Sequence, residues 1–169
     1  TDSFIYGDIN SVREKINCYT INNSCKIYAI IIEPFHAASL QGCDEKFLRD
    51  LQNICKQYNI ILIFDEVYVG WGKTGYLFYF MKYNNIVPDI LTTSKSFGGG
   101  KSSVSAYISS DEVFEKAYGT ENDAFLHSTT YNGFGEECAT AIESINIILE
   151  EKLVDRANIL GDFLKKELI

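Results

Sequence analysis

The sequence is poor in the features that mark several classes of protein. Its only basic run is the pair Lys165 and Lys166, and 15 Lys and Arg stand against 23 Asp and Glu, for a net charge of −8. Nucleic acids and anionic membrane surfaces are bound largely through clustered basic side chains. The charge balance therefore argues against a nucleic-acid partner and against a membrane partner.

Long apolar stretches are also lacking. No segment approaches the run of about 18 apolar residues that a transmembrane helix needs, and no charged-then-apolar leader opens the chain. We therefore expect neither a membrane span nor a signal peptide. The chain does not begin with Met, so we also expect it to be a fragment.

Cysteine is present, but in a pattern that favours neither zinc binding nor a disulfide framework. The cysteines are odd in number and form no CxxC pair: Cys18, Cys25, Cys43, Cys55 and Cys138. Only two histidines, His36 and His127, could complete a zinc site. Reduced thiols in a cytoplasmic protein are the expected state.

The sequence does have enough apolar material for one globular core. Hydrophobic residues make up 46% and aromatic residues 14% of its 169 residues, and a chain of this size buries roughly two-thirds of its unfolded surface. No internal repeat and no Pro/Gly/Ser-rich linker divides it. We therefore expect a single domain over residues 1–169.

Apolar runs and helical spacings alternate along the chain. Residues 27–32 and 60–64 are continuous apolar runs rich in Ile, which is typical of strands buried on both faces of a parallel sheet. Between them, residues 45–58 place apolar side chains at helical spacing. Further strands are expected at 88–93 and 104–108, and amphipathic helices at 136–150 and 153–168. This order predicts an α/β fold, a three-layer arrangement of a mostly parallel sheet with flanking helices.

Ionisable residues follow three of the expected strands. The first is followed by Glu33, the second by Asp65 and Glu66, and the third by Lys95. In open parallel sheets ligands bind beyond the carboxyl ends of the strands. An acid and a lysine that converge there would be costly to bury unless they served each other or a ligand. This edge is therefore the candidate site.

Four motifs give the chain a resemblance to one enzyme family. The run Phe64-Asp-Glu-Val-Tyr-Val-Gly-Trp-Gly-Lys-Thr-Gly75 is followed by Pro88-Asp-Ile-Leu-Thr-Thr-Ser-Lys-Ser-Phe-Gly-Gly-Gly100. Ile32-Glu-Pro34 precedes them, and His127-Ser-Thr-Thr-Tyr-Asn-Gly133 follows them. In these motifs and their order the chain resembles the class III aminotransferases, the ω-aminotransferase family of fold type I.

The resemblance implies a cofactor, pyridoxal 5'-phosphate, and residues that hold it. Lys95 matches the family's Schiff-base lysine, which acts as a nucleophile and then as a base. Asp65 matches the carboxylate on the pyridine nitrogen, which lets the ring act as an electron sink. Val67 matches the apolar residue against the ring face, and Glu33 joins the cofactor-binding set through the Glu-Pro element. Thr130 matches the threonine that reaches the cofactor phosphate of a neighbouring subunit, which implies a homodimer with a shared active site.

The sequence also departs from the family pattern. Tyr68 stands where the family commonly has a Gln that hydrogen-bonds the phenolic oxygen of the cofactor, and its hydroxyl is the candidate substitute. Ala38 stands where ornithine- and GABA-type members have a Glu that gates a substrate-binding Arg. The resemblance therefore implies a small-molecule amino donor and a keto acid or aldehyde acceptor without naming either one.

The chain resembles less than half of a family member. We expect an incomplete large domain, in which the helices of residues 135–169 lead toward a C-terminal small domain. Because catalysis needs all of its groups in place, the isolated chain is expected to be weak or inactive. Two alternatives stay open: an aminomutase or racemase of the same fold, and a non-catalytic α/β interaction module derived from it.

Overall fold

The structure is a computed structural model that describes residues 2–21, 26–123 and 125–169. Its elements, in chain order, are α1 (Ile9–Ile21), β1 (Ala29–Ile32), β2 (Phe35–His36), β3 (Gln41–Gly42), α2 (Glu45–Tyr58), β4 (Ile61–Asp65), the 3-10 helix η1 (Tyr79–Lys82), β5 (Ile90–Thr93), the 3-10 helix η2 (Lys95–Gly98), β6 (Ala106–Ser109), α3 (Asp111–Tyr118), α4 (Gly135–Glu150) and α5 (Leu153–Leu168).

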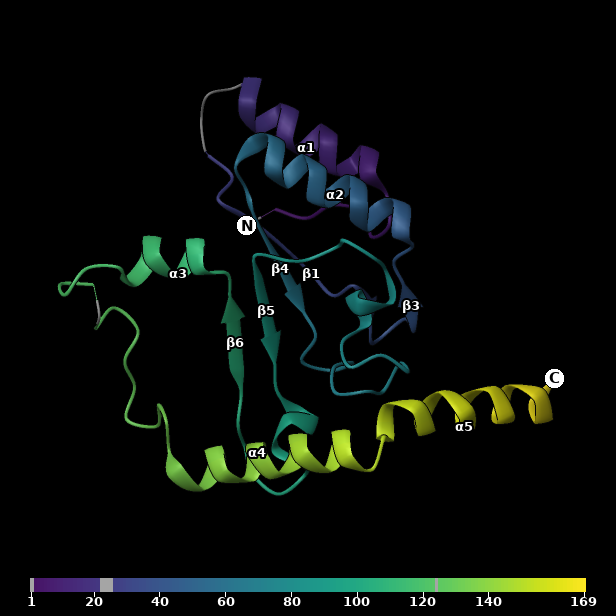
Figure 1. Cartoon of the computed structure of the whole chain (residues 1–169). Helices are drawn as coiled ribbons and strands as arrows, with labels where there is room; N and C mark the ends of the chain where they lie inside the picture. The colour runs from purple at the N-terminus through teal and green to yellow at the C-terminus, as the bar shows by residue number, and fades with distance from the viewer. Residues whose placement is uncertain (1, 22–25, 124) are drawn as a thin grey trace.

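One sheet forms the centre of the molecule. Its strand order is β1-β4-β5-β6, with β1, β4 and β5 parallel and β6 antiparallel to β5 (Figure 1). The strands β2 and β3 pair separately as a short antiparallel hairpin. The expected fold class, a mostly parallel sheet flanked by helices, is confirmed. The chain direction sends β4 and β5 to the same edge, where α4 passes the end of β5 (Figure 1).

The helix α2 shows how local sequence sets the boundaries of an element. Asp44 precedes it, and its side chain accepts a hydrogen bond from the Phe47 backbone N at 2.7 Å. Asn59 ends it in the left-handed region at φ 53°, where its N–H reaches the last carbonyls of the helix. The bounds Glu45–Tyr58 are those that the sequence predicts. The helices α4 and α5 also agree with prediction to within one residue.

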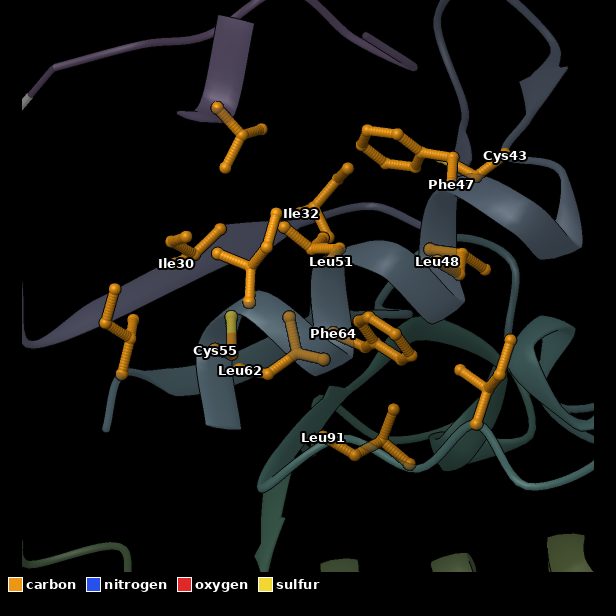
Figure 2. Close-up of a cluster of buried hydrophobic side chains, with 14 of the residues drawn as sticks. Ile30, Ile32, Cys43, Phe47, Leu48, Leu51, Cys55, Leu62, Phe64 and Leu91 are labelled. Atoms are coloured by element: carbon orange, nitrogen blue, oxygen red, sulfur yellow. The ribbon is translucent and has the colours of Figure 1, made fainter. Parts of the chain in front are cut away.

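The hydrophobic core lies between α2 and one face of the sheet. Figure 2 shows side chains of α2 packed against those of β1, β4 and β5, with Leu48, Leu51, Leu62 and Phe64 among the most deeply buried. Helix α1 adds Val12 and Ile16, one helical turn apart, to the same cluster. The core therefore fixes the parallel strands whose ends carry the candidate site.

The expectation that residues 27–32 are buried on both faces is wrong. Along β1 the side chains alternate, with Ile30 and Ile32 buried and Ala29 and Ile31 exposed; Ile31 is 58% exposed. The reason is that α1 and α2 pack on one face of the sheet, so alternate residues point to the other face. A continuous apolar run does not by itself show that both faces are covered.

Two further features bear on the composition. Among the described ranges no helix is both long and apolar enough to span a membrane. Cys43 and Cys55 are buried free thiols, and burial raises the pKa of Cys43 to about 11 and that of Cys55 to about 12. Cys25 lies outside the described residues. The two buried thiols are therefore held in the unreactive protonated form.

Candidate functional site

Asp65 and Thr92 lie side by side where two parallel strands end. They are register partners in the β4–β5 pair, so their side chains point to the same face of the sheet. That face is opposite the one buried by Phe64 and Leu91 under α2. The Asp65 carboxylate is half-buried, and its Oδ1 accepts a hydrogen bond from the Val67 backbone N at 3.0 Å. This bond orients the carboxylate at the carboxyl end of β4.

Lys95 begins the turn that follows β5. It is the first residue of η2 and has a left-handed backbone, with φ 52°. Its side chain is exposed, and Nζ lies 4.6 Å from the centroid of the Tyr68 ring. The structure therefore brings Lys95 into contact with Tyr68, and it places Asp65 at the end of the neighbouring strand, β4.

A cavity of about 720 Å³ opens beside this edge. Val67 and Thr92 line it, together with Thr93, Ser105, Ala106, Tyr107, Phe114, Tyr118, His127 and Asn132. The Thr92 hydroxyl is buried, and it has no hydrogen-bond partner within the described part of the chain. A buried hydroxyl without a partner costs free energy unless a ligand or water satisfies it. Thr92 is therefore a polar group available to a bound molecule, although no motif in the sequence singles it out.

Glu66, next to Asp65, has a different environment. It is 0% exposed, and its two carboxylate oxygens accept hydrogen bonds from the backbone N of Tyr79 (2.6 Å) and of Phe80 (3.0 Å). Burial raises the pKa of Glu66 above its ordinary value, against the effect of the two N–H donors. Because both oxygens are occupied by η1, Glu66 anchors that segment and is not presented to the cavity.

The remaining predicted residues lie outside this cluster. The Glu33 Oε2 accepts a hydrogen bond from the Ala37 backbone N at 3.1 Å, and its Oε1 lies 3.9 Å from His36 Nε2. Glu33 therefore serves a local turn. Thr130 is exposed in the loop between α3 and α4, and the cavity is lined by His127 and Asn132 of that loop and not by Thr130.

The loop at residues 70–77 also contacts the Lys95 turn. The Trp71 ring stacks on Phe97, and the Lys73 ammonium donates a hydrogen bond to Ser96 Oγ. Partial burial, together with the positive charge of Lys95, lowers the pKa of Lys73. No periodicity or local motif signals these contacts, because they join segments more than twenty residues apart.

Known proteins resemble this chain in sequence and in fold. A family model described as aminotransferase class-III matches residues 6–169. Ornithine aminotransferase from Toxoplasma gondii is 26% identical, with a TM-score of 0.83 over 99% of this chain and 37% of its own. An (S)-enantioselective ω-transaminase from Thermomicrobium roseum is 31% identical, with a TM-score of 0.82 over 94% of this chain and 35% of its own.

A third similar structure has the same extent. An aminotransferase from Bacillus anthracis is 31% identical, with a TM-score of 0.83 over 95% of this chain and 36% of its own. The chain thus spans little more than a third of the length of these relatives. In the T. gondii structure pyridoxal phosphate partially occupies the active site.

Proposed function

The chain belongs to the class III aminotransferases, and on that basis we propose that it contributes to pyridoxal 5'-phosphate-dependent transfer of an amino group. The exchange would run between an amine or amino acid and a keto acid or aldehyde. One arrangement carries the proposal: Asp65 and Thr92 are register partners at the ends of parallel strands, and Lys95 starts the turn after one of them. A carboxylate, a hydroxyl and a primary amine are thereby presented at one edge.

The groups at this edge fit pyridoxal phosphate. The unpartnered Thr92 hydroxyl is a buried polar atom that a ligand could satisfy, and Val67 adds an apolar surface in the same cavity. When bound, the cofactor supplies an electron sink for charge that develops on the substrate. Asp65 would hold a proton at the ring nitrogen, and Val67 would pack against the ring. Tyr68, Glu33 and Thr130 complete the proposed cofactor-binding set, Thr130 through the partner in a homodimer.

Lys95 has two tasks in this proposal. Its amine would hold the cofactor, and when it is free the same amine would move a proton on the substrate carbon. A lysine can do both because its ammonium can lose a proton, which an arginine guanidinium does not. The exposed Nζ over the Tyr68 ring leaves the amine open to a ligand.

The extent of the chain bears on how much activity it has alone. Because it spans about a third of its relatives, we propose that it is an incomplete large domain whose α4 and α5 lead toward a further domain. We also propose that the isolated 169 residues transfer amino groups weakly or not at all. Robust transamination by the isolated chain with added cofactor would contradict this.

The buried free thiols Cys43 and Cys55 support a reducing compartment, the cytoplasm.

The direct test is covalent trapping in the natural protein that contains this chain. Pyridoxal phosphate is added, the lysine–cofactor bond is reduced with borohydride, and the labelled peptide is identified by mass spectrometry. We expect the label on Lys95, its loss in Lys95→Ala and its retention in Lys101→Ala, a matched exposed lysine. A label elsewhere, or none, would overturn the assignment.

A second assay separates amino transfer from the other reactions of the fold. With an amine and a keto acid supplied together, an aminotransferase forms a new amino acid from the keto acid, whereas a mutase or racemase does not. Asp65→Asn is expected to keep the label on Lys95 and to lose most of the transfer rate, because only the proton at the ring nitrogen is affected. Unchanged transfer would remove Asp65 from the mechanism.

A further inference from the structure

The Lys95 turn has a backbone that needs support from its surroundings. Lys95 lies at φ 52°, in the left-handed region that side chains other than Gly rarely adopt. Such conformations persist where neighbouring contacts determine them, and they occur often at functional sites. The contacts of the residues on both sides of Lys95 are therefore the ones that can hold this backbone.

Trp71 contacts this segment on both sides of Lys95. Its ring stacks on Phe97, with 5.1 Å between ring centroids and 7° between planes. Its Nε1 donates a hydrogen bond of 2.6 Å to Thr93 Oγ1, and Thr93 is 1% exposed. The Trp71 side chain thus contacts Thr93 and Phe97, the residues two before and two after Lys95.

Lys73 holds the residue next to Lys95. Its Nζ donates to Ser96 Oγ, while the Ser96 carbonyl accepts a hydrogen bond of 3.2 Å from Ser144 Oγ on α4. The same Nζ reaches the carbonyl of Gly70 at 3.5 Å. Ser96 is therefore fixed through its side chain by the loop and through its backbone by a helix.

The loop that carries these two residues is itself fixed. The Trp71 backbone N donates to the Leu77 carbonyl at 2.6 Å, which closes the loop. Asn158 on α5 donates from Nδ2 to the Gly75 carbonyl at 2.8 Å. The contacts of Trp71 and Lys73 thus come from a segment braced by the C-terminal helix.

We infer that Trp71 and Lys73 are positioning residues that hold the left-handed Lys95 turn and so present the Lys95 amine to the cofactor. The consequence for the cofactor rests on the proposed function, whereas the restraint on the turn does not. Neither residue has to touch the substrate. Each acts through the residues that flank Lys95.

The restraint on the turn is tested by hydrogen–deuterium exchange of peptides that cover residues 93–99, without cofactor. The variants Trp71→Phe and Thr93→Val each remove the Nε1–Oγ1 bond, and Lys73→Met removes the bond to Ser96. Loss of one such bond corresponds to roughly tenfold faster local exchange. Lys73→Arg keeps a donor and is expected to restore protection. Exchange at 93–99 no faster than in the control Lys101→Met would overturn the inference.

The consequence for Lys95 is tested in the natural protein with two ligands. Pyridoxal phosphate needs the lysine for covalent trapping, whereas pyridoxamine phosphate has no aldehyde and binds without that bond. We expect about tenfold weaker trapping in Trp71→Phe and Lys73→Met, while pyridoxamine phosphate affinity changes by less than about twofold. Equal trapping in wild type and variants would overturn the positioning role. Absence of trapping in wild type would instead refute the proposed function, and the exchange experiment would still decide whether the turn is held.

Discussion

The Lys95 ammonium lies over the ring of Tyr68, with 4.6 Å between Nζ and the ring centroid. The face of an aromatic ring carries partial negative charge and attracts a cation placed above it. Because Tyr68 follows β4 and Lys95 follows β5, this contact links the ends of two parallel strands. Tyr68, which stands where the family commonly has a Gln, therefore makes a contact of its own within the site.

Substitutions at Tyr68 separate the work of its ring from that of its hydroxyl. Tyr68→Phe keeps the ring face and is expected to leave the free energy of unfolding nearly unchanged, whereas Tyr68→Leu loses about 0.5–1 kcal/mol. Urea denaturation of these variants, alone and combined with Lys95→Met, measures the coupling between the two side chains. A loss in Tyr68→Leu that persists when Lys95 is already Met would assign the effect to packing instead. If the hydroxyl also binds the cofactor, Tyr68→Phe weakens pyridoxal phosphate binding by about tenfold.

Glu66 gives a prediction for stability and its dependence on pH. Glu66→Gln replaces one acceptor oxygen by an amide nitrogen that faces a backbone N–H, so we expect a loss of about 1–3 kcal/mol in the free energy of unfolding. Burial raises the pKa of Glu66 in the folded chain above the ordinary value of 4.5. The folded state therefore binds this proton more tightly than the unfolded state does.

The sign of the pH effect follows from that raised pKa. The contribution of Glu66 is fully present below the ordinary pKa and is lost as pH rises through the raised one. The stability advantage of wild type over Glu66→Gln should thus be larger near pH 4 than near pH 7, an interval of about three units that begins just below the ordinary carboxyl value and extends above it. Urea midpoints measured across this interval test it. A wild-type advantage that grows with pH would mean that the two N–H donors outweigh burial.

The sequence predicts some elements well for identifiable reasons. The span of α2 is set by Asp44, by Asn59 and by the apolar spacing between them, all of which are local. Helix α3 is not among the predicted elements, although the Ser110 side chain caps it by accepting a hydrogen bond from Val113 N and acidic residues fill its first turn. Helix α1 is not predicted either, because it is weakly amphipathic and the packing of Val12 and Ile16 becomes visible only in the fold.

In the candidate site, too, local sequence predicts some residues and leaves others unpredicted. Strand ends and motifs located Asp65 and Lys95, because residues that follow parallel strands meet at one edge of the sheet. The contacts of Trp71 with Thr93 and Phe97 depend on how a loop folds back over that edge. The unpartnered hydroxyl of Thr92 depends on strand register and on burial. Neither property is encoded in local spacing.

Gly75 gives a prediction about the loop that supports Lys95. It lies at φ +81°, and a Cβ built there would come 1.8 Å from Asn158 Oδ1. Gly75→Ala therefore combines a left-handed backbone with a steric clash, and we expect it to cost at least about 1–3 kcal/mol in the free energy of unfolding. Adding Asn158→Ala should recover the part due to the clash when the double variant is compared with Asn158→Ala alone, because that change also removes the hydrogen bond from Asn158 Nδ2 to the Gly75 carbonyl. Thermal denaturation of the single and double variants measures this, and a full recovery would show that the backbone conformation itself costs nothing.

Thr92 predicts opposite effects on stability and on cofactor binding. Its buried hydroxyl lacks a partner within the described residues, so Thr92→Val, which has nearly the same shape, removes an unsatisfied group. Without cofactor we expect the free energy of unfolding to stay the same or to rise by about 1 kcal/mol, because the cost of the unpaired hydroxyl disappears. If that hydroxyl contacts the cofactor, pyridoxal phosphate affinity should fall by about tenfold in the same variant.

Thr93→Val is the matched comparison. Thr93 Oγ1 already accepts the Trp71 hydrogen bond, and the loss of that bond should destabilise the chain. Thermal unfolding without cofactor and equilibrium binding of pyridoxal phosphate together test this, and a Thr92→Val protein that is less stable than wild type yet binds pyridoxal phosphate normally would show that the hydroxyl has a structural partner and does not contact the cofactor.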